Sequence, residues 1–362
     1  MNDNPSLVLK SRFRRFLAWF GSHKIITAVI ALGILLLAAG VTYMILASQP
    51  KPAPVVHETI KPPEPPQKYY SLLNGIEVKT EASLRKPVTA VIIENSPDAR
   101  PQSGLKQAEV VYEAIAEGGI TRYMVLYQQN APSLIGPVRS LRPYFLDYAT
   151  SYHASIAHIG GSTKALKAVR NGNYRDIDQF FNAASYWRSP DRYAPHNVYT
   201  DSKHLAALNK SKGYVSSTFT SFQRVDGTPA SKPTARTFYV NFSSGLYNTK
   251  YTYQAKCNCY NRYLAGSLNK DRERGTITPS VVVALHVDES TVMEDWWRER
   301  IKTSGQGKAE IFQNGNITEA TWSKKNQAAP LRLIDADGKD IPLVRGQTWI
   351  AVVPNDGGSV KW

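Results

Sequence analysis

Residues 109–128 read EVVYEAIAEGGITRYMVLYQ, and the fold of the long C-terminal part of the chain can be argued from this stretch. Two strand-like runs, 109–117 and 120–128, flank the dipeptide Gly118-Gly119. Val, Ile, Tyr and Thr favour strands, and a glycine pair suits the tight turn of a hairpin. The stretch therefore predicts a β-hairpin.

The segments around this hairpin predict a mixed α/β domain over residues 69–212. Further strand-like runs cover 89–94 and 155–159. Helical patterns follow Pro137, over 141–152, and Gly161, over 163–169.

The rest of the chain predicts a second, mostly-β domain. Residues 213–235 are rich in Ser, Thr, Lys and Gly and are interpreted as a connection. From 236 to 362, short runs of Tyr, Val and Thr alternate with turn signals. We expect Arg262 and Asp271 to pair across a hairpin in this domain. The predicted fold class is α+β, with a mixed α/β first domain and a mostly-β second domain.

An apolar stretch precedes the folded part. Residues 25–47 carry no charge, and as a helix they would span roughly 34 Å, enough for a hydrocarbon core. Five basic residues and one acid precede it, so the positive-inside rule places 1–24 in the cytoplasm and the bulk of the chain outside. Residues 48–68 contain seven prolines and predict an extended linker.

Other interpretations of the apolar stretch are weaker. Leu46-Ala47-Ser48 offers a cleavage site for a signal peptide, but the apolar run is too long for a typical signal core. A lipoprotein needs a cysteine near the end of the run, and the chain has none there. A buried core helix would be amphipathic. The sequence therefore predicts a single-pass membrane protein.

The net charge and the cysteine content limit the kinds of ligand that the chain is expected to bind. The formal net charge is +15, of which +11 belongs to the exported part. Outside the cytoplasm the available polyanions are wall polymers and anionic lipids, although the surplus can also serve solubility alone. No nucleic-acid motif is present. The cysteines, Cys257 and Cys259, lack further metal ligands nearby, so we expect no metal and no cofactor, and the pair is either free or locally bridged.

Four segments combine glycine or proline with polar side chains: 113–122, 136–144, 158–163 and 192–199. Ser140 and Ser162 are placed to cap helix starts, where free N–H groups suit an anion. Arginines in these segments suit phosphate or carboxylate.

Proton transfer is a second interpretation of the same segments. It would use His158 or His196, with Glu113 or Glu117 as the orienting acid. Each feature also has a plain structural interpretation as a cap, a turn, an ion pair or packing. No complete nucleophile or metalloprotease motif is present.

These segments resemble the YerB-like family of bacterial lipoproteins, which carries a two-part domain of unknown function. The matching stretches include ARPQSGLKQAEVVYEAIAEGGITRY, GPVRSLRPYF, HIGGS and YAPHNVYT, then YNRYLAG, GQGKAEIFQNG and GQTWIAVVP. The resemblance implies a bacterial extracytoplasmic protein and brings no mechanism. The motif positions carried over as a candidate ligand site are Glu113, Glu117, Arg122, Arg139, Ser140, Arg142, His158, Ser162, His196 and Asn197.

The leading functional hypothesis is a cell-envelope module that binds an anionic wall polymer or a lipid-linked precursor, with the second domain serving an envelope protein partner. The alternative is a hydrolase or transferase acting on a wall precursor or polymer. A third hypothesis is a scaffold whose polar motifs only hold loops together.

Overall fold

The computed structural model describes residues 5–51, 67–294 and 296–362. They divide into two units, Met1–Pro65 and Pro66–Trp362. The first unit contains helices α1 (Pro5–Ser22) and α2 (Lys24–Ala47). Helix α2 has a mean hydropathy of 2.6, buries none of its side chains, and is long and apolar enough to cross a membrane. It coincides with the predicted span, whereas most of the predicted linker lies outside the described residues.

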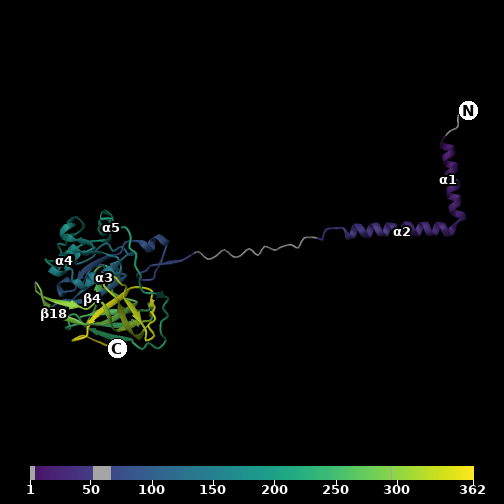
Figure 1. Cartoon of the computed structure of the whole chain (residues 1–362). Helices are drawn as coiled ribbons and strands as arrows, with labels where there is room; N and C mark the ends of the chain where they lie inside the picture. The colour runs from purple at the N-terminus through teal and green to yellow at the C-terminus, as the bar shows by residue number, and fades with distance from the viewer. Residues whose placement is uncertain (1–4, 52–66, 295) are drawn as a thin grey trace. The chain divides into compact units, whose positions relative to one another are not determined.

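The second unit is built on one ten-stranded sheet (Figure 1). In spatial order its strands are β22 (Arg332–Ile334), β21 (Asn316–Lys324), β20 (Gly305–Gln313), β17 (Val281–Val287), β24 (Thr348–Pro354), β4 (Val110–Glu117), β5 (Ile120–Tyr127), β3 (Thr89–Glu94), β6 (Ser155–His158) and β7 (Arg175–Asp178).

The predicted hairpin forms the centre of this sheet. Strands β4 and β5 pair antiparallel from Val110↔Leu126 to Glu117↔Ile120, with a bulge before Glu117. Gly118 and Gly119 have φ of 55° and 76°, which a two-residue hairpin turn requires and glycine adopts without strain. The prediction of the hairpin is confirmed.

Different layers cover the two faces of the sheet. Helices α3 (Pro143–Thr150) and α4 (Thr163–Asn171) bury residues such as Phe145 and Val169 against one face. The other face packs on a second, five-stranded sheet, where the rings of Phe238 and Phe312 stack 3.6 Å apart. The strands of that sheet, in order, are β14 (Ser267–Leu268), β13 (Cys259–Leu264), β12 (Thr249–Gln254), β11 (Thr237–Asn241) and β25 (Ser359–Lys361).

Smaller elements complete the unit. Helix α5 (Ser202–Ser211) follows the strand pair β8 (Trp187–Arg188) and β9 (Val198–Tyr199). The remaining two-stranded pairs are β1 (Tyr69–Tyr70) with β2 (Glu77–Val78), β10 (Arg224–Val225) with β23 (Leu343–Val344), β15 (Lys270–Asp271) with β16 (Gly275–Thr276), and β18 (Glu289–Met293) with β19 (Trp297–Ile301). The short 3-10 helices are η1 (Glu81–Arg85), η2 (Pro97–Ala99), η3 (Leu105–Gln107), η4 (Gln179–Phe181) and η5 (Ala183–Ser185).

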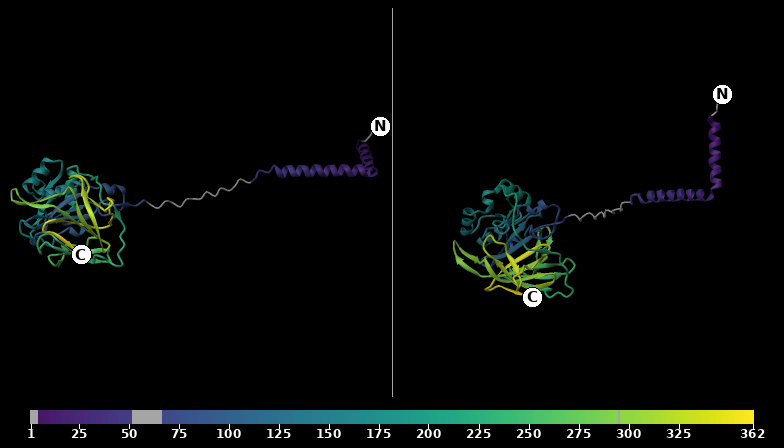
Figure 2. Two further views of the ribbon diagram at one scale, coloured as in Figure 1. Left: turned by 60° about the horizontal axis from the view of Figure 1, so that its bottom comes forward. Right: turned by 45° about the vertical axis from the view of Figure 1, so that its right-hand side comes forward.

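The β18–β19 hairpin projects from the folded unit in each view (Figure 2). Cys257, in the turn after β12, and Cys259, the first residue of β13, form a disulfide, which is the bridged alternative of the two left open by the sequence.

Strands from both predicted domains share the large sheet. The junction is the parallel pair β24 and β4, in which Thr348 lies opposite Val110. Among the described residues after 212, every regular element is a strand. The α+β class with a mostly-β C-terminal region is therefore confirmed, while the predicted boundary at 213–235 stays a prediction about the sequence.

The direction of the strands positions the polar residues. Strands β3, β4, β6, β7, β17 and β24 run the same way, because β5 is antiparallel to both β3 and β4. Their carboxyl ends therefore share one edge of the sheet, the edge at which ligands bind in open α/β sheets. Glu94, Glu117 and His158 each end a strand at this edge.

Candidate functional site

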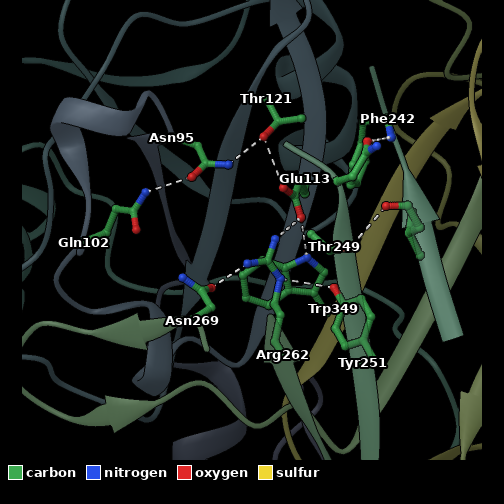
Figure 3. A network of polar contacts seen from close by, with 12 residues as sticks. Asn95, Gln102, Glu113, Thr121, Phe242, Thr249, Tyr251, Arg262, Asn269 and Trp349 are labelled. Carbon is green, nitrogen blue, oxygen red and sulfur yellow. Dashed lines mark hydrogen bonds and ion pairs between the residues drawn. The ribbon is translucent and has the colours of Figure 1, made fainter. Parts of the chain in front are cut away.

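Glu113 lies in the middle of β4 and is fully buried between the two sheets (Figure 3). Its carboxylate accepts hydrogen bonds from Arg262 Nη2 at 2.7 Å, Trp349 Nε1 at 2.9 Å and Thr121 Oγ1 at 3.1 Å. Thr121 in turn accepts from the Asn95 amide. The partners enclose Glu113 completely, so this carboxylate holds the sheets together and faces no ligand.

Arg262 is the matching cation, contributed by β13. It also donates to Asn269 and Tyr251, and its guanidinium lies 4.3 Å from the Trp349 ring centre. Burial disfavours its charge, but Glu113 raises the pKa of Arg262, which stays protonated. The expected pairing of Arg262 with Asp271 is wrong.

Asp271 has other partners. Its carboxylate accepts the backbone N–H groups of Lys106, Glu273 and Arg274. It therefore orders turns rather than balancing a charge across a hairpin.

Glu117 ends β4 and gathers arginines. Arg122 contacts one carboxylate oxygen at 2.9 Å, and Arg142 binds the other through Nε and Nη2. Arg298 of the β18–β19 hairpin lies 3.9 Å from the same carboxylate. Burial opposes the charge, yet Arg122 and Arg142 lower the pKa of Glu117 to about 2.

The two serines expected to cap helices behave differently. Ser162 is the N-cap of α4, and its Oγ accepts the N–H of Ala165. Ser140 caps nothing, because α3 begins only at Pro143 with Arg142 as its N-cap. The Ser140 carbonyl instead accepts a hydrogen bond from Arg122 at 2.7 Å.

His158 ends β6 and is fully buried. Its Nδ1 lies 2.8 Å from the Gly160 carbonyl, and its Nε2 lies 3.0 Å from Asp176. Burial raises the pKa of Asp176, but the hydrogen bond from His158 outweighs this effect together with the other contacts, and the pKa of Asp176 is lowered. With both ring nitrogens engaged, His158 has none left for a substrate.

His196 has a different setting. Its Nδ1 lies 2.9 Å from Oε2 of Glu94, the last residue of β3. The other Glu94 oxygen lies 3.1 Å from Arg139, so one buried carboxylate serves both residues. Ser96 Oγ lies 3.3 Å from the same Nδ1. Among the described residues no partner contacts Nε2 of His196. A Ser-His-Glu triad needs the serine and the acid on different ring nitrogens, and it is excluded here because Ser96 and Glu94 both contact Nδ1.

Main-chain pairing brings the sequence segments together. Val138 N–H donates to the Val198 carbonyl, which joins the 136–144 segment to the 192–199 segment. Ser162 N–H donates to the Leu141 carbonyl, which adds the 158–163 segment. The segments therefore converge at the carboxyl edge, although their side chains form separate groups around Glu94, Glu117 and His158.

A cleft of about 670 Å³ opens beside His196. It is lined by Asp98, Asp191, Arg192, Tyr193, Ala194, His196 and Arg272. Arg272 comes from the second half of the chain and pairs with Asp191 at 2.8 Å, a contact that raises its pKa. Tyr193 is almost fully exposed. The cleft is polar, and both halves of the chain contribute to it.

Arg192 is the unusual cation of this cleft. Its guanidinium donates to two carbonyls, those of Asp98 at 2.6 Å and Pro101 at 2.7 Å. Within the described part of the chain it has no carboxylate within ion-pair distance. Asn197 orders this loop, accepting from Arg188 and donating to the Arg192 carbonyl. Asn197 thus positions the cleft rather than lining it.

Several residues of the cleft were absent from the sequence-based site. Glu94 ends a predicted strand, which was the available signal. Arg192 and Tyr193 begin a segment that the sequence had singled out, but Arg272 and Asp191 carried no signal. Among the described residues, no cluster of three or more His, Cys, Asp or Glu is arranged to hold a metal.

Comparison with known proteins places these features in a family. Residues 73–215 match the N-terminal domain, and residues 238–350 the C-terminal domain, of a protein family of unknown function, DUF3048. The chain is 32% identical over 311 residues to "Putative lipoprotein YerB" of Bacillus subtilis (strain 168), covering 83% of this chain and 91% of that protein. The crystal structure of B. subtilis YerB matches with a TM-score of 0.72 at 28% identity, covering 82% of this chain and all of that one.

Proposed function

This chain belongs to the DUF3048 family, and from that premise we propose that it is a membrane-tethered extracytoplasmic protein whose cleft at His196 binds a cell-wall polymer. The relative is named "Putative lipoprotein YerB", and in this proposal the apolar helix α2 supplies a membrane attachment of another kind. In this proposal α2 spans the bilayer once, with 1–24 in the cytoplasm and the folded unit outside.

The observation that carries the proposal is Arg192 in the cleft. A guanidinium held by two carbonyls has further N–H groups that can donate to a phosphate or carboxylate. Asp98 lines the same cleft, and its carboxylate has no ion-pair partner among the described residues. The cleft therefore suits a ligand that carries both an anionic group, for Arg192, and a hydrogen-bond donor, for Asp98. Because Asp98 repels negative charge, the cleft does not attract every polyanion.

The test is cosedimentation of the fragment 67–362 with isolated bacterial cell walls at low and high salt. Arg192→Gln removes the anchoring cation, and Arg236→Gln removes an exposed charge outside the cleft as a matched control. Loss of one charge-assisted contact corresponds to about 10- to 100-fold weaker binding.

Walls stripped of their phosphate polymers identify the anion. Binding that survives high salt and falls only in the Arg192 variant supports the proposal, because exposed charge alone is screened. Equal loss in both variants, or binding that vanishes with salt, contradicts it. Loss on the stripped walls assigns the anion to the phosphate polymer, and retention assigns it to the peptidoglycan.

A second function, acid–base catalysis on the same polymer, is favoured by the Glu94–His196 pair. A carboxylate on Nδ1 orients the ring and leaves Nε2 as a general base. In this second function, turnover would fall by about 10²- to 10⁴-fold in His196→Gln, a much larger loss than that of binding. If the wild-type protein releases no wall fragments, the enzyme hypothesis fails and the binding function stands alone.

A further inference from the structure

Helix α1 exposes a continuous apolar face. Phe13, Phe16 and Leu17 are 64%, 57% and 55% exposed. At 3.6 residues per turn they share one side of the helix with Phe20. Arg14 and Arg15 occupy other directions, and the helix contains no acidic residue. Helix α1 is therefore amphipathic and basic.

The chain bends sharply between α1 and α2. Only His23 separates Ser22 from Lys24, and its backbone is not helical, with φ of −115° and ψ of 56°. The His23 ring stacks 4.9 Å from Trp19, and Thr27 Oγ1 donates to the Phe20 carbonyl at 2.8 Å. The two helices run in different directions in every view (Figures 1 and 2). If α2 crosses a bilayer, α1 leaves it at the surface.

We propose that α1 lies in the plane of the membrane on anionic phospholipid, with its aromatic face at the acyl boundary and its arginines on the headgroup phosphates. This inference rests on the proposed membrane span of α2. A basic helix with a Phe-rich apolar face fits the interface of a bilayer better than the hydrocarbon core or water.

The positive charge of α1 favours anionic lipid over helix α2 as the partner of its apolar face. Residues 5–22 carry four basic side chains and no acid, so an anionic surface complements them. Helix α2 offers no countercharge between Ile25 and Ala47, either from this chain or from a second copy. Packing of α1 against another α2 would leave its arginines unpaired.

The experiment uses the full chain reconstituted in vesicles, with an environment-sensitive fluorophore on one introduced cysteine. The native cysteines form a disulfide and do not react without reductant. Phe16→Cys and Ala18→Cys place the probe on opposite sides of α1. In vesicles containing phosphatidylglycerol we expect blue-shifted emission from position 16 and water-like emission from position 18.

Charge variants then identify the partner. Each basic residue near an anionic surface raises the ratio of surface-bound to free α1 roughly fivefold, so Arg14→Gln/Arg15→Gln should lower this ratio by roughly 25-fold. Lys210→Gln/Lys212→Gln removes equal charge from the folded unit and should change nothing. Equal emission at positions 16 and 18, or equal shifts in purely zwitterionic vesicles, overturns the proposal. A probe at Leu36 reports the span separately: if it is exposed to water, the topology fails first.

Discussion

Two buried glutamates, Glu113 in the sheet interior and Glu94 at the sheet edge, have opposite surroundings. Glu113 is enclosed by Arg262, Trp349 and Thr121, and every one of these partners is itself buried. Glu94 shares its charge between Arg139 and His196, both of which reach the surface.

The difference separates what holds this fold together from what is available to a ligand. A charge sealed between two sheets stabilises only if its partner stays in place. A charge at the end of a strand, beside a cleft, orients a histidine whose second nitrogen is open. The same residue type therefore contributes to stability at one position and, in the proposed function, to recognition at the other.

The largest effect should follow from breaking the sealed pair. Arg262→Met leaves Glu113 buried without its cation, and we expect about 3–5 kcal/mol of stability to be lost. Urea unfolding of the fragment 67–362 measures it. Adding Glu113→Gln removes the uncompensated charge and should restore part of the loss. A single variant as stable as the wild type would show that water reaches Glu113.

Acid should test the intermediate case, Glu117. Its folded-state pKa of about 2 lies below its ordinary value of 4.5. The stabilisation by the ionised carboxylate is therefore complete above pH 4.5 and is lost as the pH falls toward 2. The total loss of unfolding free energy should be up to about 3 kcal/mol. Glu117→Gln should flatten this part of the curve of unfolding free energy against pH. An unchanged acid slope would mean that the Arg122 and Arg142 contacts do not persist in solution.

His158 should behave as a structural residue. His158→Gln leaves the carboxylate of Asp176 without the hydrogen bond from the imidazole ring, which should cost about 1–2 kcal/mol of stability. At a temperature where the variant is fully folded, its binding to cell walls should equal that of the wild type. Thermal unfolding and cosedimentation of one preparation measure both. Loss of binding in a variant that keeps its melting temperature would return His158 to the site.

The sequence predicted local structure better than it predicted which distant side chains contact one another. The β4–β5 hairpin and the Ser162 cap follow from neighbouring residues, so they could be predicted and are confirmed. The partner of Glu113 lies 149 positions away, and that of Glu94 lies 102 positions away. Such pairings depend on strand order and on which loops meet at the carboxyl edge. The histidines were therefore found but assigned the wrong acids, Glu113 and Glu117 instead of Glu94 and Asp176.

The smallest stability effect should come from His196, and it sharpens the comparison most. His196→Gln leaves Glu94 paired with Arg139, so the unfolding free energy should stay within about 0.5 kcal/mol of the wild type. Wall binding or turnover should fall, because His196 lines the cleft and its Nε2 has no partner among the described residues. The same substitution at His158 should give the reverse result. If both variants lose stability and neither loses binding, Glu94 belongs with Glu113 as a structural carboxylate, and the ligand site lies elsewhere on the carboxyl edge.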